Sequence, residues 1–326
     1  QCSSEITARY KASLLQGESL ADLTGGFGID CSFLATGFRS ATYVERQAEL
    51  CAIAAHNFPA LDLNHISVRN DDGVAYLEAM SPVDCIFLDP ARRNEHGGKT
   101  VAISDCEPNV AELEELLLQK ANRVMIKLSP MLDLSLALKE LKQTQEVHIL
   151  SVNNECKELL ILLGQTSPAE ISIHCVNLFT KGTQKEQHFV FTREQEQCSE
   201  CTYTDSLETY LYEPNASLLK AGAFRSIAAA YPVRKLHPNS HLYTSDTFIE
   251  NFPGRIFRIV NQCSFNKKEV KENLADLKKA NVTVRNFPAT VAELRKRIHL
   301  AEGGDTYLFA STLNNGQKVL IRCEKV

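Results

Sequence analysis

The sequence contains no run of apolar residues that approaches the roughly 20 needed to cross a bilayer. Its opening residues lack the charged-then-apolar pattern of a secretory signal peptide, and it has no internal repeat or low-complexity tract. Because it opens with Gln1 rather than Met, we expect a natural N-terminal region to precede it. These absences, together with 44% apolar residues, predict a soluble protein of two domains with no membrane partner.

The eleven cysteines show no arrangement typical of a disulfide framework. Several lie within apolar stretches, which indicates reduced, buried thiols and a cytoplasmic location (Cys31, Cys51, Cys85 and Cys175). Cys198 and Cys201 have the spacing of a metal-binding pair, but no second pair completes four ligands, so we expect no metal. His148 and His174 alternate with apolar strand residues, and we expect them to be solvated or hydrogen-bonded rather than catalytic.

The net charge of −5 hides an asymmetry. Residues 220–326 hold 18 Lys and Arg against 9 Asp and Glu, whereas the remainder holds 17 against 31. A basic end on an acidic body favours a polyanionic partner, although an ordinary solvated lysine-rich surface would give the same count.

From residue 19 to about 150, short apolar runs alternate with amphipathic segments. The expected strands are 19–24, 41–45, 65–69, 83–88 and 123–128, and the expected helices are 29–35, 47–56, 73–80, 107–121 and 132–141. A short helix over 4–16 precedes them, with Ser3 or Ser4 as N-cap and Gly17 as the stop signal. This alternation predicts an α/β, Rossmann-like fold with a parallel sheet between helices.

The alternation ends near residue 147. Two apolar runs, 147–152 and 159–163, predict an antiparallel hairpin at the sheet edge, and 171–178 and 188–192 predict further strands. Polar residues 193–209 predict a linker. Beyond it, helices over 217–230, 267–280 and 291–298 and strands over 255–259, 307–312 and 318–323 predict a small α+β domain. We expect domains over 1–200 and 205–326.

A glycine-rich turn follows the first strand and opens a helix. It contains Thr24, Gly25, Gly26, Phe27 and Gly28, and Asp22 precedes it. In a doubly wound sheet, ligands bind beside such turns at the carboxyl ends of the strands. Glycines there permit positive φ and a close approach of the ligand to the backbone.

Acidic residues end the next two strands. Glu45 can accept hydrogen bonds from both hydroxyls of a ribose, and Asp71 or Asp72 can reach an adenine amino group. A carboxylate at Asp22 would repel a pyrophosphate but suits a ligand that carries an ammonium and a sulfonium. The pattern therefore predicts S-adenosyl-L-methionine as the cofactor.

The fourth strand ends in Asp89-Pro90-Ala-Arg92-Arg93, beside the expected cofactor. Methyl transfer is an in-line displacement, so the protein mainly aligns the acceptor with the methyl group. Asp89 can accept a proton, and Pro90 stiffens the turn. Arg92 can contact the acceptor, and Arg93 can bind its phosphates.

These segments resemble motifs I to IV of class I methyltransferases. Further blocks resemble a bacterial methyltransferase family with a THUMP-like, ferredoxin-like C-terminal domain: residues 4–12, 127–133, 155–158, 212–222 and 243–246. The resemblance covers nearly the whole chain and implies an RNA substrate, rRNA or tRNA, modified on a base. It makes Tyr212, Asn215 and Lys220 candidate RNA contacts, with packing of the domain boundary as the alternative.

Two departures limit the chemistry that the resemblance implies. Ala91 and Arg92 stand where enzymes that methylate exocyclic amines usually carry a proline and an aromatic residue, which puts that chemistry in doubt. Cys156 comes one strand too late to match the nucleophile of uridine C5-methyltransferases, so we expect a structural or substrate-edge thiol. A protein or small-molecule substrate, and a non-catalytic RNA-binding module, stay open as alternatives.

Overall fold

The computed structural model describes residues 2–92, 102–166 and 168–326, and the chain forms two units, Gln1–Arg193 and Glu194–Val326. The second unit begins inside α7 (Arg193–Cys198), in the polar stretch expected to be a linker. The Glu196 carboxylate accepts the backbone N–H groups of Phe224, Arg225 and Ser226, at the start of α9 (Ser226–Ala230). Part of the expected linker is therefore a helix, α7, and its Glu196 side chain caps α9.

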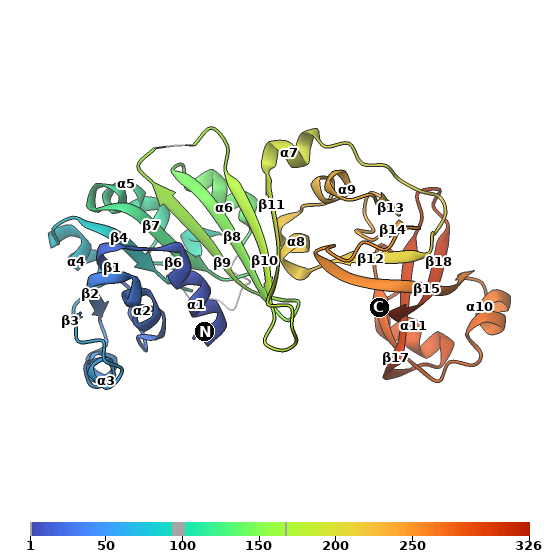
Figure 1. The fold of residues 1–326 in the computed structure, drawn as a ribbon, viewed down its shortest axis with the longest axis horizontal. Helices are drawn as coiled ribbons and strands as arrows, with labels where there is room; N and C mark the ends of the chain where they lie inside the picture. Colours follow the sequence, from blue (N-terminus) through green and yellow to red (C-terminus); the bar gives the residue numbers. More distant parts are fainter. Residues whose placement is uncertain (1, 93–101, 167) are drawn as a thin grey trace. The chain divides into compact units, whose positions relative to one another are not determined.

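Unit 1 is built around a nine-stranded sheet, shown on the left of Figure 1 in the order β11-β10-β8-β9-β7-β4-β1-β2-β3. Five strands are parallel, β3 (Ile66–Asn70), β2 (Phe38–Glu45), β1 (Gly17–Asp22), β4 (Val83–Leu88) and β7 (Ala121–Leu128). The helices are α1 (Glu5–Leu14), α2 (Ile29–Leu34), α3 (Ala48–Ala60), α4 (Gly73–Ala79), α5 (Val110–Lys120) and α6 (Leu134–Glu140). The predicted α/β, Rossmann-like fold is confirmed.

The predicted antiparallel hairpin is present, but its predicted place at the sheet edge is wrong. It consists of β8 (Thr144–Val152) and β9 (Glu155–Gly164), with Asn153 and Asn154 at positive φ in the turn. The parallel strand β10 (Ser172–Leu178) covers β8, and the antiparallel β11 (Glu186–Thr192) forms the edge. Every residue of Leu159–Leu163 is fully buried, which a strand with both faces covered requires.

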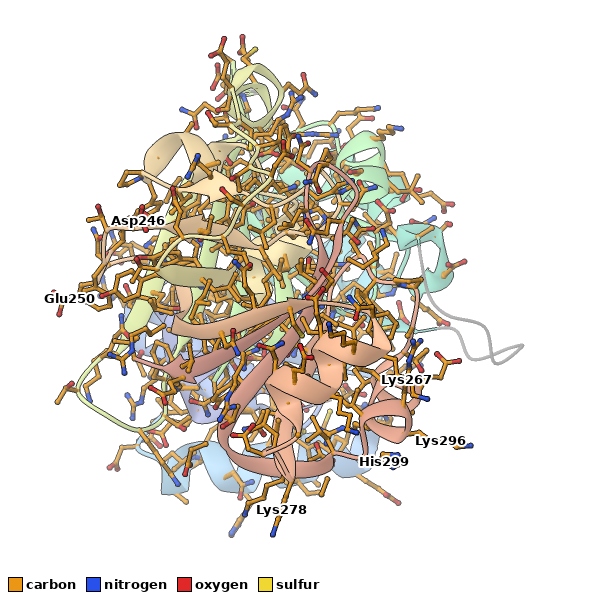
Figure 2. The ribbon with its side chains drawn as sticks, turned by 90° about the vertical axis from the view of Figure 1, so that its right-hand side faces the viewer. Asp246, Glu250, Lys267, Lys278, Lys296 and His299 are labelled. Carbon is orange, nitrogen blue, oxygen red and sulfur yellow. The ribbon has the colours of Figure 1, made fainter. Side chains whose placement is uncertain are left out.

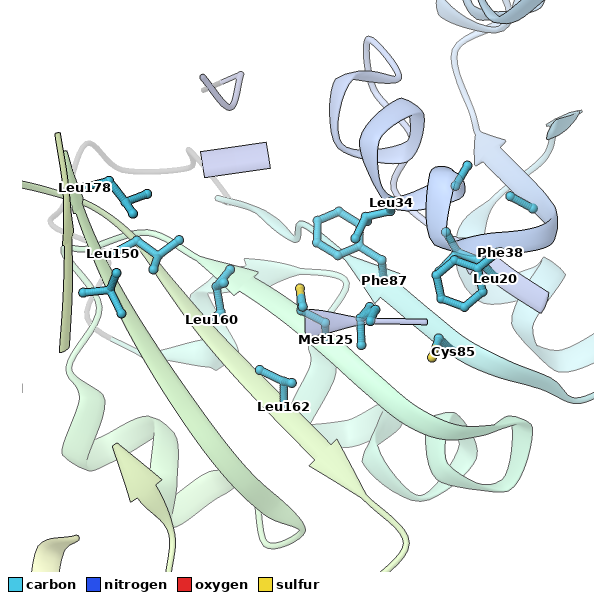
Figure 3. Close-up of a cluster of buried hydrophobic side chains, with 14 residues drawn as sticks. Leu20, Leu34, Phe38, Cys85, Phe87, Met125, Leu150, Leu160, Leu162 and Leu178 are labelled. Carbon is cyan, nitrogen blue, oxygen red and sulfur yellow. The ribbon is translucent and has the colours of Figure 1, made fainter. Parts of the chain in front are cut away.

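One apolar layer connects the parallel strands to the hairpin. Figure 3 shows Leu20 and Phe87 beside Met125, followed by Leu160 and Leu150 across the sheet. Leu34 of α2 packs on this layer, and so do the apolar side chains of α1. Truncation of such a leucine typically costs about 2–5 kcal/mol, so this core fixes the strand ends that carry the site.

Unit 2 contains a seven-stranded sheet in the order β13-β14-β12-β15-β18-β17-β16. Its strands are β12 (Tyr210–Pro214), β13 (Arg234–Lys235), β14 (Tyr243–Ser245), β15 (Gly254–Ser264), β16 (Lys279–Val284), β17 (Ala301–Thr312) and β18 (Lys318–Lys325). Its helices after α7 are α8 (Ala216–Ala221), α9, α10 (Lys267–Leu274) and α11 (Val291–Ile298). The predicted α+β class is confirmed.

Two helix predictions in unit 2 are wrong in extent. The single helix expected over 217–230 is split into α8 and α9, because Gly222 adopts a left-handed conformation that ends α8. The helix expected over 267–280 ends at Leu274, and the chain then forms β16, which pairs in parallel with β17. No helix in the described part of the chain is long and apolar enough to span a membrane.

Candidate active site

The glycine turn lies between β1 and α2. A Cβ atom on Gly25 would lie 2.2 Å from the Tyr43 ring, and one on Gly28 would lie 2.9 Å from the Phe58 ring. These two glycines make room for the protein's own aromatic side chains. A Cβ on Gly26, with φ +53°, would have one neighbour within 4 Å, the Thr24 carbonyl oxygen at 3.8 Å, so of these three glycines Gly26 leaves a ligand the most room to approach the backbone.

Glu45, at the end of β2, reaches back to this turn. Its Oε2 accepts the N–H of Gly26 at 2.9 Å and its Oε1 accepts the N–H of Gln47 at 2.9 Å. A carboxylate offers about four acceptor positions, so these two bonds leave about two for further donors such as hydroxyl groups. The ends of β1 and β2 therefore meet at one carboxylate.

Asp71 and Asp72 follow β3 at the same edge of the sheet. Oδ1 of Asp72 accepts the N–H groups of Val74 and Ala75 at 2.9 and 3.1 Å, so Asp72 is the N-cap of α4. Oδ1 of Asp71 accepts the N–H of Asp72 at 2.8 Å. Both side chains are exposed, and Asp72 has a structural role in addition to any contact with a ligand.

Asp22 lies beneath the turn rather than at its surface. It is 1% exposed, and its Oδ1 accepts the N–H of Thr24 at 3.0 Å. Burial raises the pKa of Asp22 to about 8, against the lowering effect of the Thr24 N–H. Asp22 is therefore an interior carboxyl group rather than one exposed at the turn, and its raised pKa keeps it mostly protonated at neutral pH.

Asp89 joins β4 to both β1 and β7. Its N–H donates to Thr24 Oγ1 at 2.6 Å, and its Oδ2 lies 2.6 Å from Lys127 Nζ. Burial raises the pKa of Asp89, although Lys127 lowers it. The side chain is 36% exposed and Pro90 behind it is buried, so Asp89 presents a carboxylate held by a cation on a rigid corner.

A buried ionic network continues from Lys127 to α1. Lys127 Nζ lies 3.0 Å from Asp30 Oδ2, and Lys11 Nζ lies 3.1 Å from Asp30 Oδ1 and 2.5 Å from Glu158 Oε2. Ser3 Oγ donates to Asp30 at 2.8 Å. Burial opposes the ionisation of Asp30, but Lys11 and Lys127 hold its pKa below the usual value.

The sequence interpretation assigned this network no role, although a signal was present. Lys127 interrupts the apolar run of β7 and is 5% exposed, and Lys11 is fully buried. A lysine is almost never fully buried unless it has a partner, so each of them calls for a nearby carboxylate.

Other predicted site residues lie elsewhere or are not described. Arg92 forms β5 (Ala91–Arg92) with its pairing strand β6 (Cys106–Glu107), but its side chain and all of Arg93 lie outside the described residues. The Phe27 side chain is 57% exposed on the turn. Cys156 is half-buried at the start of β9.

The three candidate RNA contacts belong to unit 2, and two of them are interior residues. Tyr212 is fully buried, and its hydroxyl donates to Thr247 O at 2.6 Å. Asn215 is 1% exposed and caps α8 through its Oδ1. Lys220 is half-buried on α8. Their packing roles explain Tyr212 and Asn215, so we do not count these two as RNA contacts.

Comparison with known proteins supports this description. Residues 210–253 match a ferredoxin-like domain model, and residues 254–325 match a THUMP domain-like model. No curated protein matches the chain. A crystal structure from Porphyromonas gingivalis W83, described as a candidate methyltransferase, is 37% identical with a TM-score of 0.91, over 100% of this chain and 82% of that one.

Partial likenesses extend to other solved structures. An rRNA methylase from Streptococcus thermophilus is 14% identical with a TM-score of 0.37, over 50% of this chain and 98% of that one. M. capricolum TrmK, solved with S-adenosyl-homocysteine, is 13% identical with a TM-score of 0.37, over 51% and 70%. Likenesses of this size carry no argument about this chain. The full-length match and the C-terminal domain do: the chain belongs to the family of class I S-adenosyl-L-methionine-dependent methyltransferases with a THUMP-like C-terminal domain.

Proposed function

We propose that this methyltransferase modifies a base in structured RNA, rRNA or tRNA, and that the carboxyl edge of the unit 1 sheet is its active site. S-adenosyl-L-methionine supplies an electrophilic methyl group on a sulfonium. The protein has to bind this donor, align the acceptor and receive the proton that the acceptor loses. The Asp89–Lys127 pair beside the glycine turn is the observation that supports the reaction.

The side chains at this edge suit a cationic adenosyl ligand. Gly26 offers an open backbone approach, Glu45 keeps free acceptor positions for ribose hydroxyls, and Asp71 and Asp72 would face the adenine. Thr24, Gly25, Phe27 and Gly28 complete the turn, and Asp22 lies buried beneath it. Acidic groups predominate here, which favours a cation over a pyrophosphate.

Asp89 is the acceptor-side group. Lys127 and the bond from the Asp89 N–H to Thr24 fix its orientation, and its raised pKa makes the carboxylate a better proton acceptor than a free aspartate. As the acceptor atom bonds to the methyl carbon and the carbon–sulfur bond breaks, Asp89 would take or hydrogen-bond the acceptor's proton. Pro90 and Arg92 would shape the acceptor's approach.

RNA binding is assigned to one face of the THUMP-like domain. Its exposed cations, which we call the basic surface, are Lys267, Lys268, Lys271, Lys278, Lys279, Lys296, Arg297 and His299. Figure 2 shows Lys267, Lys296 and His299 on the right of the view and Lys278 at its lower edge, with the acidic Asp246 and Glu250 on the left. Among the described residues, none of these six lysines forms an ion pair, so they are available for phosphates.

Methyl transfer is tested first. The protein is incubated with labelled cofactor and total cellular RNA, and the modified nucleoside is located by mass spectrometry. Asp89→Asn should abolish transfer while cofactor binding persists, and Glu49→Gln, on the exposed side of α3, should behave as wild type. Transfer to protein instead of RNA would refute the assigned substrate, and absence of saturable cofactor binding would indicate a non-catalytic module.

The basic surface is tested by charge reversal. A triple variant with Lys267→Glu, Lys271→Glu and Lys296→Glu should weaken binding to structured RNA and reduce the salt dependence of log K by about 0.7–0.9 per lost phosphate contact. The matched control reverses Lys139, Lys181 and Lys185, which are exposed in unit 1. Equal losses in both triple variants would show that net charge, not this surface, governs the interaction.

A further inference from the structure

Three neighbouring strands of unit 1 carry the same short pattern, a polar residue followed two positions later by histidine. The pairs are Glu146 and His148 on β8, Ser172 and His174 on β10, and Glu186 and His188 on β11. His174 on β10 lies opposite His148 on β8 and opposite Val190 on β11. His188 is two residues before Val190 and therefore on the same face of the sheet, so the three imidazoles form a row across the strands.

The row is compact and in contact. The His148 and His174 rings stack with centroids 4.3 Å apart, and His174 Nδ1 lies 3.2 Å from His188 Nε2. His148 Nε2 lies 3.2 Å from Glu146 Oε2. One potential ligand atom from each of Glu146, His148 and His174 lies within 4.8 Å of the other two.

The donor atoms of this group are of the types that bind a metal ion. A neutral imidazole keeps a lone pair on one ring nitrogen at physiological pH, and this is the form that binds a metal ion. The carboxylate of Glu146, held by Arg123 at 3.2 Å, supplies the negative charge.

We propose that Glu146, His148 and His174 form a Zn²⁺ site on this face of the sheet. Two imidazoles and one carboxylate are a donor set that suits zinc and leaves a fourth position for water. Bonds of about 2.1 Å in a tetrahedron place ligand atoms roughly 3.4 Å apart, so the two rings have to leave their stacked arrangement and tilt toward the ion.

The residues around these ligands have the arrangement of an outer shell. A zinc-bound histidine usually donates its other ring N–H to an acceptor, and His148 Nδ1 lies 2.9 Å from the hydroxyl oxygen of Tyr10 on α1. In the same way, His188 Nε2 lies 3.2 Å from His174 Nδ1 and would accept the N–H of that ring nitrogen. The ion would join α1 to β8 and β10. This site lies outside the Asp89–Lys127 network and does not depend on the proposed RNA methylation. It also revises the sequence-based expectation of no metal.

The test is a titration of the metal-free full chain with Zn²⁺ against a chromophoric chelator. The protein carries Cys198→Ser and Cys201→Ser throughout, so that this cysteine pair cannot bind the ion. We expect one Zn²⁺ per chain, with affinity reduced on the order of 100-fold or more by His174→Gln or Glu146→Gln and about 10-fold by Tyr10→Phe. His56→Gln, an exposed histidine on α3, is the matched control and should not change the affinity.

Two further readouts separate binding from folding. Zn²⁺ should raise the thermal midpoint of the parent protein but not that of His174→Gln, whose half-exposed side chain can be replaced without opening the core. Co²⁺ should give the strong visible absorption of a tetrahedral site in the parent only. Equal Zn²⁺ affinity in the parent and in folded His174→Gln and Glu146→Gln, or no stoichiometric binding in the parent, would overturn the proposal.

Discussion

Replacement of Lys127 by Met removes the cation that joins Asp89 to Asp30. Lys127 is 5% exposed, and its Nζ lies 2.6 Å from one carboxylate and 3.0 Å from the other. Removal of one partner of a buried pair typically costs about 3–5 kcal/mol. Because Asp89 is 36% exposed and Asp30 retains Lys11, we expect the lower end, about 3 kcal/mol.

This loss is measurable by calorimetry at neutral pH. For a unit of about 150–250 residues, each kcal/mol shifts the melting temperature by about 2–4 °C, so Lys127→Met should lower it by roughly 6–12 °C. The variant should also lose the cation that lowers the pKa of Asp89, so the pKa rises further. If ionised Asp89 is needed for methyl transfer, the acid limb of the pH–rate profile moves to higher pH.

The pH dependence of the loss distinguishes an ionic role from simple packing. Unpartnered carboxylates destabilise Lys127→Met only while they are ionised, so the deficit should be largest at pH 7 and shrink as the pH falls through the pKa values of Asp89 and Asp30. The double variant Lys127→Met, Asp89→Asn should recover part of the loss. A deficit that is the same at pH 4 and pH 7, with additive effects in the double variant, would refute the ionic explanation.

Three further perturbations test the surroundings of the site and the corrected residues. Gly25→Ala should destabilise unit 1 by about 1–3 kcal/mol in urea denaturation, because the new Cβ would overlap the Tyr43 ring, and an unchanged midpoint would contradict this packing. Because burial raises the pKa of Asp22 to about 8, its contribution to stability is full below pH 4 and lost as the pH rises through 8. Asp22→Asn should therefore gain stability relative to wild type from pH 4 to pH 8, and parallel denaturation curves would contradict the shift. Asn215→Ala should cost about 1–2 kcal/mol through the lost α8 cap and leave RNA affinity unchanged; a weaker RNA complex with intact folding would restore Asn215 as a contact.

The parallel half of unit 1 could be predicted because each of its strands is bounded by local signals. Topology then places the ends of β1, β2 and β4 at one edge, so Glu45 and Asp89 could be assigned to one site before any coordinate was known. The position of the hairpin could not be predicted in this way, because only the later strands β10 and β11 decide which strand forms the edge.

The ionic network shows a different limit of the sequence. Lys11 and Glu158 are 147 residues apart, and no spacing rule connects a helix before the first strand to a strand after the fifth. Lys127 was detectable as a cation within an apolar strand, but the burial of Lys11 and the partners of both lysines were not. In unit 2, residues 267–280 carry a helical pattern throughout, yet β16 takes the place of the last part of the expected helix. The β-branched residues Val282, Thr283 and Val284 favour this strand.

The charges of the network bear on how the enzyme would distinguish its cofactor from its product. Asp30, Asp89 and Glu158 carry three negative charges against the two positive charges of Lys11 and Lys127, so the group is net negative even when Asp22 is protonated. S-adenosyl-L-methionine brings a sulfonium cation that the product thioether has lost, so this field should favour the donor over the product. Calorimetric titration of both ligands should show that Asp89→Asn narrows the ratio of their affinities. A ratio that is unchanged by removal of this charge would mean that contacts, and not the field of the network, set the preference.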